Sequence, residues 1–551
     1  MPSITINGTV HEFEQGQTIL EIALSNEVEI PHYCYHPGLS IAASCRICLG
    51  EVWAPNPRND NALEAWPKLV PTCQQTASDG MVVYTDSPKA TANQRQVMEF
   101  LLINHPVDCP VCDQAGECHL QDYSYQYGRG ESRFKEDKDK NPKKNVGENV
   151  LLYSDRCIMC TRCVRFTREV SGTGELMIDG RGGLEEIDVF PGMALDNEIA
   201  SNVIDICPVG ALLDKDFLFQ QRVWFLTKTA SIDGITSSGD NIFVEHNEGV
   251  VHRIKPLTNL DMNGWWITDE VRYGWHFVQA ENRLRMPLIR GGDAYEQHEA
   301  GVAWTDSIAH ANKVLQDAHA GGGSLGVLIS PMLSCEDAFL LAKWVRSIDP
   351  SATLGVGPVP VHGEDKVFPR GFTVRAEKAP NARGVRRVLE GIAGKAPLEA
   401  DEFQAKCASG SFAAVAMTGN YPSDWVTQEW IDALADTPFV LIDTLDNRLV
   451  HAAEVTLPGA TWMEKSGTFQ NVNNVLQSFH RAINPVDYCK SEAQLALDLM
   501  AALVDGHARG FDAEEVRAEI SALNGLESFQ SDVQHPEEIS KVESDMVYVD
   551  L

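Results

Sequence analysis

Twelve candidate metal ligands lie within the first 207 residues of this 551-residue chain, and they fall into three groups of four. Each iron-sulfur cluster needs four thiolate or imidazole ligands, and a C-x2-C pair allows one loop to supply two of them. The spacing therefore predicts three clusters, one 2Fe-2S and two 4Fe-4S, and makes electron transfer the first hypothesis for the chain's chemistry. The ligands are Cys34, Cys45, Cys48 and Cys73; His105, Cys109, Cys112 and Cys118; and Cys157, Cys160, Cys163 and Cys207.

Length and charge limit the class of protein. A chain of 551 residues is too long for one hydrophobic core, so several domains are expected. Its 45 basic and 78 acidic residues give a formal charge of −33, which repels phosphate backbones and argues against nucleic acid as a partner. Eleven of the 14 cysteines precede residue 208, unlike the disulfide framework of a short secreted chain. Because no signal-like N-terminus and no long apolar run are found, we expect membrane attachment only through another protein.

The first 88 residues have the order of a β-grasp 2Fe-2S ferredoxin domain. Residues 3–13 alternate apolar and polar around Asn7-Gly8, which predicts a hairpin, and Thr18 to Glu21 form a capping box that predicts a helix to about Ser25. The first two cysteines of the group are separated by ten residues, more than in plant-type ferredoxins. Residues 55–67 are interpreted as a surface insertion. A structural zinc site is the alternative for four cysteines, and a visible absorption spectrum would distinguish the two.

The second group begins with a histidine. A helix is predicted over residues 92–104, ended by Pro106, and His105 stands four residues before Cys109. A lone histidine is usually not a ligand, but here the three cysteines need a fourth donor. The segment through Gly116 resembles the 4Fe-4S site with one histidine and three cysteines of complex I and of iron-only hydrogenases.

The third group resembles half of a two-cluster bacterial ferredoxin. In such modules each C-x2-C-x2-C triplet is completed by the Cys-Pro of the other motif, as by Cys207-Pro208 here. The places of the second cluster's ligands hold other residues, so a single 4Fe-4S cluster is predicted; these residues are Thr167, Asn197, Ala200 and Val203. Three nearby arginines are interpreted as a solvated helix face, although cations there would favour a reduced cluster; they are Arg162, Arg165 and Arg168.

The same loss of ligands recurs downstream. Residues 231–241 resemble the start of the cluster domain of molybdopterin oxidoreductases, in which cysteines follow a C-x2-C-x3-C pattern. The corresponding places here are Asp233, Thr236, Asp240 and Thr268. Oxygen ligands hold a 4Fe-4S cluster poorly, so we expect this mostly β domain to carry none.

The C-terminal half alternates strands and helices. Strands are predicted over residues 325–330, 412–417 and 439–442 and a helix over 336–348, which indicates a parallel α/β sheet. Gly321 to Gly323 are interpreted as a loop. The remaining cysteines are too scattered for a motif and are taken as inert thiols; they are Cys335, Cys407 and Cys489. Residues 457–472 resemble a stretch of the molybdopterin-oxidoreductase domain. The region from residue 281 onward is too short to hold the full cofactor-binding site of an active molybdenum enzyme.

Taken together, these sites resemble the large iron-sulfur subunit of respiratory complex I, known in mitochondria as the 75 kDa subunit. The fold class is multidomain α+β and α/β. The expected domains are a 2Fe-2S ferredoxin-type domain at 1–88, the histidine-led 4Fe-4S domain at 89–128, a ferredoxin-like single 4Fe-4S module at 129–220, a cluster domain without its cysteines at 221–280, and a vestigial molybdopterin-oxidoreductase-like domain at 281–551.

The resemblance implies a subunit of an ion-translocating NADH:quinone oxidoreductase with no catalytic site of its own. It would relay single electrons from the flavin-bearing NADH dehydrogenase subunit and its small 2Fe-2S partner to a two-cluster 4Fe-4S subunit and the quinone-module subunits. We expect no molybdopterin and no FMN on this chain, and a location on the cytoplasmic face of the inner membrane, or the matrix side in mitochondria. The alternative is an iron-sulfur subunit of an NAD-linked hydrogenase or formate dehydrogenase.

Overall fold

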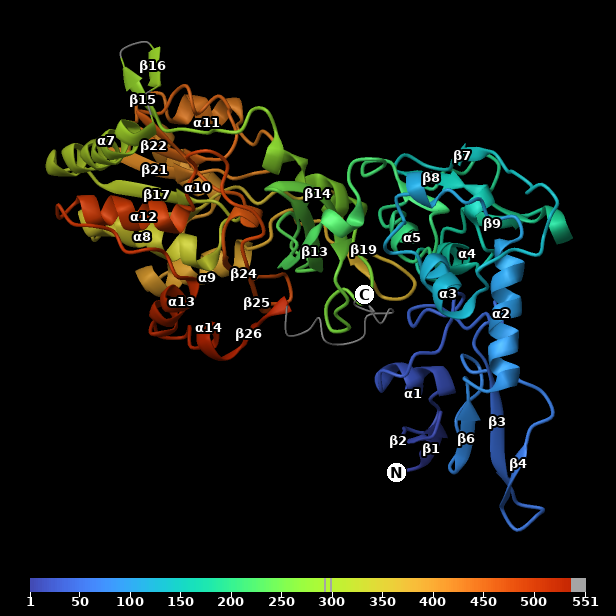
Figure 1. Ribbon diagram of the computed structural model, residues 1–551. Helices are drawn as coiled ribbons and strands as arrows, with labels where there is room; N and C mark the ends of the chain where they lie inside the picture. The colour runs from blue at the N-terminus through green and yellow to red at the C-terminus, as the bar shows by residue number, and fades with distance from the viewer. Residues whose placement is uncertain (292–293, 298–299, 537–551) are drawn as a thin grey trace. The chain divides into compact units, whose positions relative to one another are not determined.

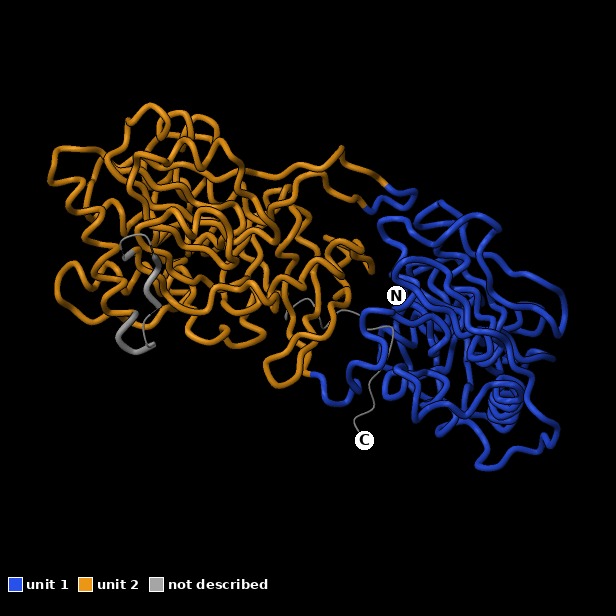
Figure 2. Tube along the Cα trace, turned by 90° about the horizontal axis from the view of Figure 1, so that it is seen from above, with its two compact units in different colours: residues 1–226, 368–372, 541–551 blue, residues 227–367, 373–540 orange. Residues whose placement is uncertain are grey.

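A computed structural model describes residues 1–291, 294–297 and 300–536. The chain divides into two compact units (Figure 2). Unit 1 comprises residues 1–226 and 368–372, and unit 2 comprises residues 227–367 and 373–536 of the described chain. Within the described residues, no helix combines the length and the apolar character needed to cross a bilayer.

Unit 1 begins with a mixed sheet in the order β2-β1-β6-β3-β4, with β5 paired to β3 (Figure 1). The predicted hairpin is confirmed as β1 and β2, and the predicted helix as α1, where the Thr18 side chain and Glu21 form the capping box. Ile4, Leu20 and Val83 are among the buried residues of this domain. The expected insertion is an extended hairpin between β3 and β4. The elements are β1 (Ser3–Ile6), β2 (Thr9–Glu12), α1 (Ile19–Ser25), β3 (Leu49–Asn56), β4 (Ala62–Ala65), β5 (Val70–Pro71) and β6 (Met81–Tyr84).

The rest of unit 1 consists of short elements joined by ligand-bearing loops. The helix predicted over 92–104 is α2, which begins earlier because Ser87 caps it and Pro88 occupies its first turn. Two small sheets, β11-β8-β7 and β10-β9, brace the loops. The elements are α2 (Pro88–Leu102), η1 (Cys109–Val111), α3 (His119–Tyr127), β7 (Lys143–Asn145), β8 (Val150–Tyr153), η2 (Ser154–Arg156), α4 (Arg162–Glu169), β9 (Leu176–Asp179), η3 (Gly182–Leu184), β10 (Glu186–Val189), α5 (Asn202–Asp205), β11 (Leu212–Asp214) and η4 (Val223–Phe225).

Unit 2 opens with the mostly β segment that the sequence predicts. Its antiparallel sheet has the order β12-β13-β14 and is followed by two short helical segments. Ile232, Val244 and Trp275 belong to one buried apolar cluster between these elements. The elements are β12 (Thr227–Ile232), β13 (Asn241–Asn247), β14 (Val250–Pro256), α6 (Asp269–Tyr273) and η5 (Gly274–Gln279).

A larger sheet forms the centre of unit 2, in the order β16-β15-β23-β22-β21-β17-β18. The five strands from β23 to β18 are parallel, which confirms the predicted α/β sheet, while β15 is antiparallel to both β16 and β23. The predicted strands are β17, β21 and β22, and the predicted helix is α8. These strands are β15 (Leu288–Gly291), β16 (Ala294–Gln297), β17 (Leu325–Ile329), β18 (Thr353–Val356), β21 (Ala414–Thr418), β22 (Phe439–Asp443) and β23 (Val455–Pro458).

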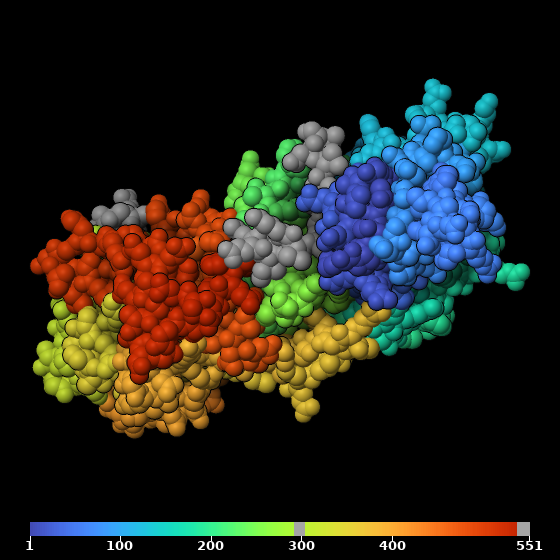
Figure 3. All heavy atoms as spheres, turned by 90° about the horizontal axis from the view of Figure 1, so that it is seen from below, coloured from blue at the N-terminus to red at the C-terminus, as the bar shows by residue number. Residues whose placement is uncertain are grey.

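Helices cover both faces of this sheet. One buried cluster joins it to α7, α8, α9 and α12, and a second joins it to α10 and α11. The last helices form a continuous surface, red in Figure 3. The elements are α7 (Ala300–Ala320), α8 (Cys335–Ile348), β19 (Lys366–Val367), β20 (Thr373–Val374), α9 (Ala382–Ala393), α10 (Ala400–Ala408), α11 (Gln428–Ala433), η6 (Trp462–Glu464), β24 (Gly467–Gln470), β25 (Leu476–Phe479), α12 (Glu492–Ala502), α13 (Ala513–Ser521), α14 (Ser528–Ser531) and β26 (Val533–Gln534).

Candidate metal centres

The structure brings the four cysteines of the first group together. The Sγ atoms of Cys48 and Cys73 lie 3.6 Å apart, and the neighbouring thiols of Cys45 and Cys73 lower the pKa of Cys34 far below its usual range. Cys34, Cys48 and Cys73 are buried, and Cys45 is partly exposed. The loop between the ligands takes left-handed backbone at Ala43, with φ 49°, and at Arg46, with φ 61°. Such conformations are costly for residues with a Cβ, and they turn the loop so that its thiols converge.

The second group lines a single pocket between the end of α2 and the start of α3. Its walls include the three cysteines, His105, Arg156 and Gly210. The Nδ1 atom of His105 is buried and has no hydrogen-bond partner in the described structure. Burial, followed by the nearby charge of Arg156, lowers the pKa of His105 to about 4, so its ring is neutral and has a lone pair to donate.

This donor set fits a metal cluster. A bare, buried imidazole nitrogen facing three thiols is costly without a partner, and iron would supply one. His105 lines the same pocket as Cys109, Cys112 and Cys118, so its role as the fourth donor stays a prediction that the lining of the pocket allows.

The third group lines a mostly apolar pocket, with all four cysteines in its walls beside Leu152, Ile158 and Val209. Left-handed residues again shape the ligand loop, namely Met159 with φ 54° and Thr161 with φ 61°. Burial raises the pKa of the Cys160 thiol to about 11 and holds the pKa of the Cys163 thiol well above its usual value. A thiolate is therefore unfavourable here unless a bound cation stabilises it, as coordinated iron would.

The positions of the lost ferredoxin ligands are taken by ordinary side chains. Thr167 Oγ1 donates to the carbonyl of Val164 at 3.2 Å, and Asn197 Nδ2 donates to Glu175 at 2.9 Å. Ala200 and Val203 are buried apolar residues. These side chains satisfy their own contacts, and none is a good donor for iron.

The solvated-face interpretation of the arginines on α4 is wrong for two of them. Arg162 is 2% exposed and Arg165 is 9% exposed, whereas Arg168 is exposed. The buried pair donates hydrogen bonds to main-chain carbonyls of the ligand loops, which compensates part of the cost of removing their charge from water. Helical spacing alone does not reveal these carbonyls, because they come from distant loops.

In the cluster domain without cysteines, hydrogen-bonded side chains occupy two of the four ligand places, Asp233 and Thr236. The carboxylate of Asp233 accepts hydrogen bonds from the main chain of Ile235 and from Thr236 and Ser238. Asp240 is also buried, and Thr268 serves as the N-cap of α6. Burial raises the pKa of Asp233 to about 6. All four places carry hard oxygen donors, which are unsuited to a 4Fe-4S cluster.

Two pocket residues were missed at the level of sequence. Arg156 is buried, lies 3.0 Å from Asp108, and stacks over Tyr153 at 4.0 Å. Gly210 packs so closely that a Cβ there would lie 2.3 Å from Cys112 Sγ. The only sequence signal for a role in the pocket was that Arg156 directly precedes Cys157 and that Gly210 lies three residues after Cys207.

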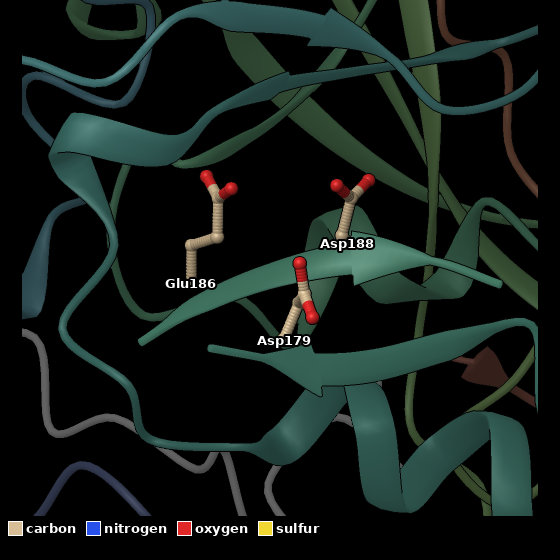
Figure 4. A group of neighbouring side chains, drawn as sticks. All are labelled: Asp179, Glu186 and Asp188. Atoms are coloured by element: carbon tan, nitrogen blue, oxygen red, sulfur yellow. The ribbon is translucent and has the colours of Figure 1, made fainter. Parts of the chain in front are cut away.

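The three scattered cysteines of unit 2 are buried, as expected for inert thiols. Burial raises the pKa of both Cys407 and Cys489 to about 12. A separate group of carboxylates, Asp179, Glu186 and Asp188, converges on β9 and β10 (Figure 4). Lys144 Nζ already lies 2.8 Å from Glu186 and 2.5 Å from Asp188, so this group is a surface ion-pair network.

Comparison with known families matches these sites in order. The matching family models are a 2Fe-2S iron-sulfur cluster binding domain at 2–88, the NADH-ubiquinone oxidoreductase-G iron-sulfur binding region at 94–133, the ferredoxin-like domain of NADH-quinone oxidoreductase subunit 3 at 147–213, an NDSU1/NuoG-like 4Fe-4S domain at 226–276, and molybdopterin oxidoreductase at 394–502. In this order of domains the chain is similar to the 75 kDa subunit of NADH-quinone oxidoreductase. The predicted fold class is confirmed, and the chain carries both 2Fe-2S and 4Fe-4S binding domains.

Relatives in the 75 kDa subunit family share about two fifths of the aligned residues. The mitochondrial NADH dehydrogenase [ubiquinone] iron-sulfur protein 1 of Solanum tuberosum is 42% identical over 312 residues, 57% of this chain and 40% of that protein. The NADH-ubiquinone oxidoreductase 75 kDa subunit of Reclinomonas americana is 37% identical over 351 residues, 64% of this chain and 48% of that protein. The alignments thus span less than half the length of these relatives. A chain from the crystal structure of an NAD+-reducing [NiFe]-hydrogenase in the H2-reduced state is 28% identical, covering 40% of this chain and 91% of that chain, with a TM-score of 0.33.

Proposed function

We propose that this chain is an electron-transfer subunit of an NADH-quinone oxidoreductase. The observation that carries the proposal is the convergence of three four-ligand sets in unit 1, each on its own loops. Similarity to NADH-quinone oxidoreductase subunits supports the same proposal. Single electrons would pass between these sites on their way from NADH oxidation toward quinone, in a complex that couples the transfer to ion translocation.

The proposed ligands are the twelve residues of the three groups, holding one 2Fe-2S and two 4Fe-4S clusters. Bound clusters would supply one-electron oxidation and reduction. The chain itself holds them in place, and its left-handed loop residues and helix ends fix the donors. It also shields the third site with Leu152 and Val209 and places the positive charge of Arg156 beside the second. We propose no catalytic acid or base on this chain, and no molybdopterin or FMN.

The partners follow from the proposed relay. Clusters exchange single electrons, whereas NADH gives up a hydride. A flavin-bearing subunit must therefore accept the two electrons of the hydride and pass them on one at a time. We propose that this subunit and its small 2Fe-2S partner deliver electrons, and that a two-cluster 4Fe-4S subunit and the quinone-module subunits receive them. The chain would then sit peripherally on the cytoplasmic face of the inner membrane, or on the matrix side in mitochondria. The domain boundaries at 88, 128, 220 and 280 are proposed on the same basis.

Iron analysis and one pair of variants test the ligand assignment. Full-length protein prepared anaerobically should contain about ten irons per chain, whereas about fourteen would mean that the cysteine-free cluster domain is loaded. His105→Ala should alter the paramagnetic resonance of one 4Fe-4S cluster and leave the 2Fe-2S signal intact. His105→Cys is the matched variant and should be milder, because a thiolate can take the same place. Unchanged signals from both 4Fe-4S clusters in His105→Ala would contradict the assignment.

A further inference from the structure

Helix α4 carries two buried arginines between two ligand sets. The helix begins at Arg162, directly after the loop that holds Cys157 and Cys160, and Cys163 lies in its first turn. Arg162 is 2% exposed and Arg165 is 9% exposed. Charged side chains are almost never this buried without a specific role for the charge.

Each guanidinium contacts the main chain of both ligand sets. Arg162 Nη2 donates to the carbonyl of Tyr35, and its Nη1 donates to the carbonyl of Ile206 at 3.3 Å. These two carbonyls lie next to Cys34 and Cys207 in sequence. Each contact therefore reaches the backbone one residue away from a proposed cluster ligand.

Arg165 repeats the pattern one turn later. Its Nη2 donates to the carbonyl of Cys34 and, at 3.4 Å, to the carbonyl of Cys160, while its Nη1 donates to the carbonyl of Ser40. Glu169, at the end of the same helix, accepts from the main-chain N–H of Ser40 at 2.9 Å. The loop of residues 34–40 is thus fastened along α4 by three successive side chains.

The position of the two charges explains why burial is tolerated. A buried guanidinium keeps its proton and is stabilised by nearby negative charge. Every electron added to a thiolate-ligated cluster makes that site more negative, so cations between two sites favour the reduced form of both. The hydrogen bonds also hold the two ligand loops at a fixed separation.

We propose that Arg162 and Arg165 form a bridge between the first and third ligand sets, which raises the reduction potentials of both sites and positions them for electron exchange. The inference rests on the proposed function. In the exchange one electron leaves the reduced site and enters the oxidised one, so one site is oxidised and the other reduced. No covalent bond forms or breaks in the exchange, and no proton is transferred. The two arginines are positioning residues.

The test compares three variants of the full-length protein, loaded with its clusters. Arg165→Gln removes the charge, and Arg165→Lys keeps the charge but lacks the guanidinium group that donates to two carbonyls at once. Arg168→Gln removes an exposed charge from the same helix. Dithionite titration under argon, followed by paramagnetic resonance, gives the midpoint potential of each cluster. Iron content and the unfolding midpoint are measured for every variant.

In Arg165→Gln, reduction of the first and third sites should both become about tenfold less favourable, a shift of about 59 mV to more negative potential for one electron. Arg165→Lys should recover most of this shift because it restores the charge. Arg168→Gln should change either equilibrium by less than about twofold, since an exposed charge is screened by solvent. The histidine-led site serves as an internal reference and should also change by less than about twofold.

Equal potentials in Arg165→Gln and Arg168→Gln would overturn the bridge, as would a shift confined to one of the two sites. If Arg165→Gln loses iron instead, the loss should reach about six irons, from both sites, because the same guanidinium supports both loops. Loss from one site alone would contradict the proposal. Failure of the proposed function has a different signature, since the unsubstituted protein would then lack iron and the resonance signals.

Discussion

Gly210 allows the closest packing in the histidine-led pocket, and Gly210→Ala should damage that site selectively. The Cβ of an alanine there would lie 2.3 Å from Cys112 Sγ and 3.1 Å from the Cβ of Gln114. Ordinary contact begins near 3.4 Å, so the ligand sulfur and residue 210 must separate by about 1 Å. Overpacking of this kind costs about 1–3 kcal/mol, and a metal site tolerates displacements of only about 0.5 Å.

The expected result is loss of one 4Fe-4S cluster. Iron should fall from about ten to about six per chain, with the 2Fe-2S signal retained, because the first group lies on separate loops. The matched control is Gly130→Ala, where no atom lies within 4 Å of the added Cβ and the backbone does not require glycine. Iron analysis and paramagnetic resonance on both variants decide the outcome. A Gly210→Ala protein with about ten irons and unaltered signals would refute the close-packing argument.

Three further predictions concern unit 2 and the whole chain. Lys465→Met should lower the free energy of unfolding by about 3–5 kcal/mol in denaturant titration, because it leaves the carboxylates of Asp337 and Glu492 buried without their cation; a loss below about 1 kcal/mol would show that the pair is dispensable. Asp240→Asn should raise the melting temperature near pH 7, since burial and the neighbouring Asp233 raise the pKa of Asp240 and disfavour its charged form. Burial also raises the pKa of Asp233 to about 6. In the unsubstituted protein the stability that Asp233 contributes should therefore be fully present below about pH 4 and should be lost as pH rises through about 6, because the folded state retains a proton that the unfolded state releases; a flat calorimetric profile over that range would contradict this. The isolated chain should be reduced by dithionite but not by NADH until a flavoprotein partner is added, and rapid bleaching by NADH in a flavin-free preparation would indicate a self-contained dehydrogenase.

Local spacing carried most of what the sequence could predict. Asn7-Gly8 and the capping box at Thr18 depend on residues within one turn, so the hairpin and α1 were predictable. The parallel sheet of unit 2 followed from continuous apolar runs, since strands buried on both faces need apolar residues at every position. The ligand sets stay a prediction, which rests on the number of donors that one cluster requires.

Features set by distant contacts were not predictable. Arg162 and Arg165 fit the spacing of a solvated helix face, yet they are buried because carbonyls of residues 34–40 lie over α4. Gly210 carries no motif beyond its place after Cys207-Pro208, and its role depends on Cys112, almost a hundred residues earlier. In both cases the deciding partner is far away in sequence, where periodicity and spacing give no information.

The cysteine-free cluster domain has a consequence for how the protein depends on nutrient supply. Two of its ligand places, Asp233 and Thr236, hold side chains that hydrogen-bond to each other, and unit 2 is further stabilised by large apolar clusters, so this half can fold without metal. On the proposed ligand assignment, unit 1 gains a large part of its folding free energy from iron, because buried thiols and a bare imidazole nitrogen are unfavourable without it. In an iron-starved cell unit 2 would therefore fold while unit 1 stayed unfolded. The unfolded N-terminal half, still attached to the folded C-terminal half, would be exposed to proteases.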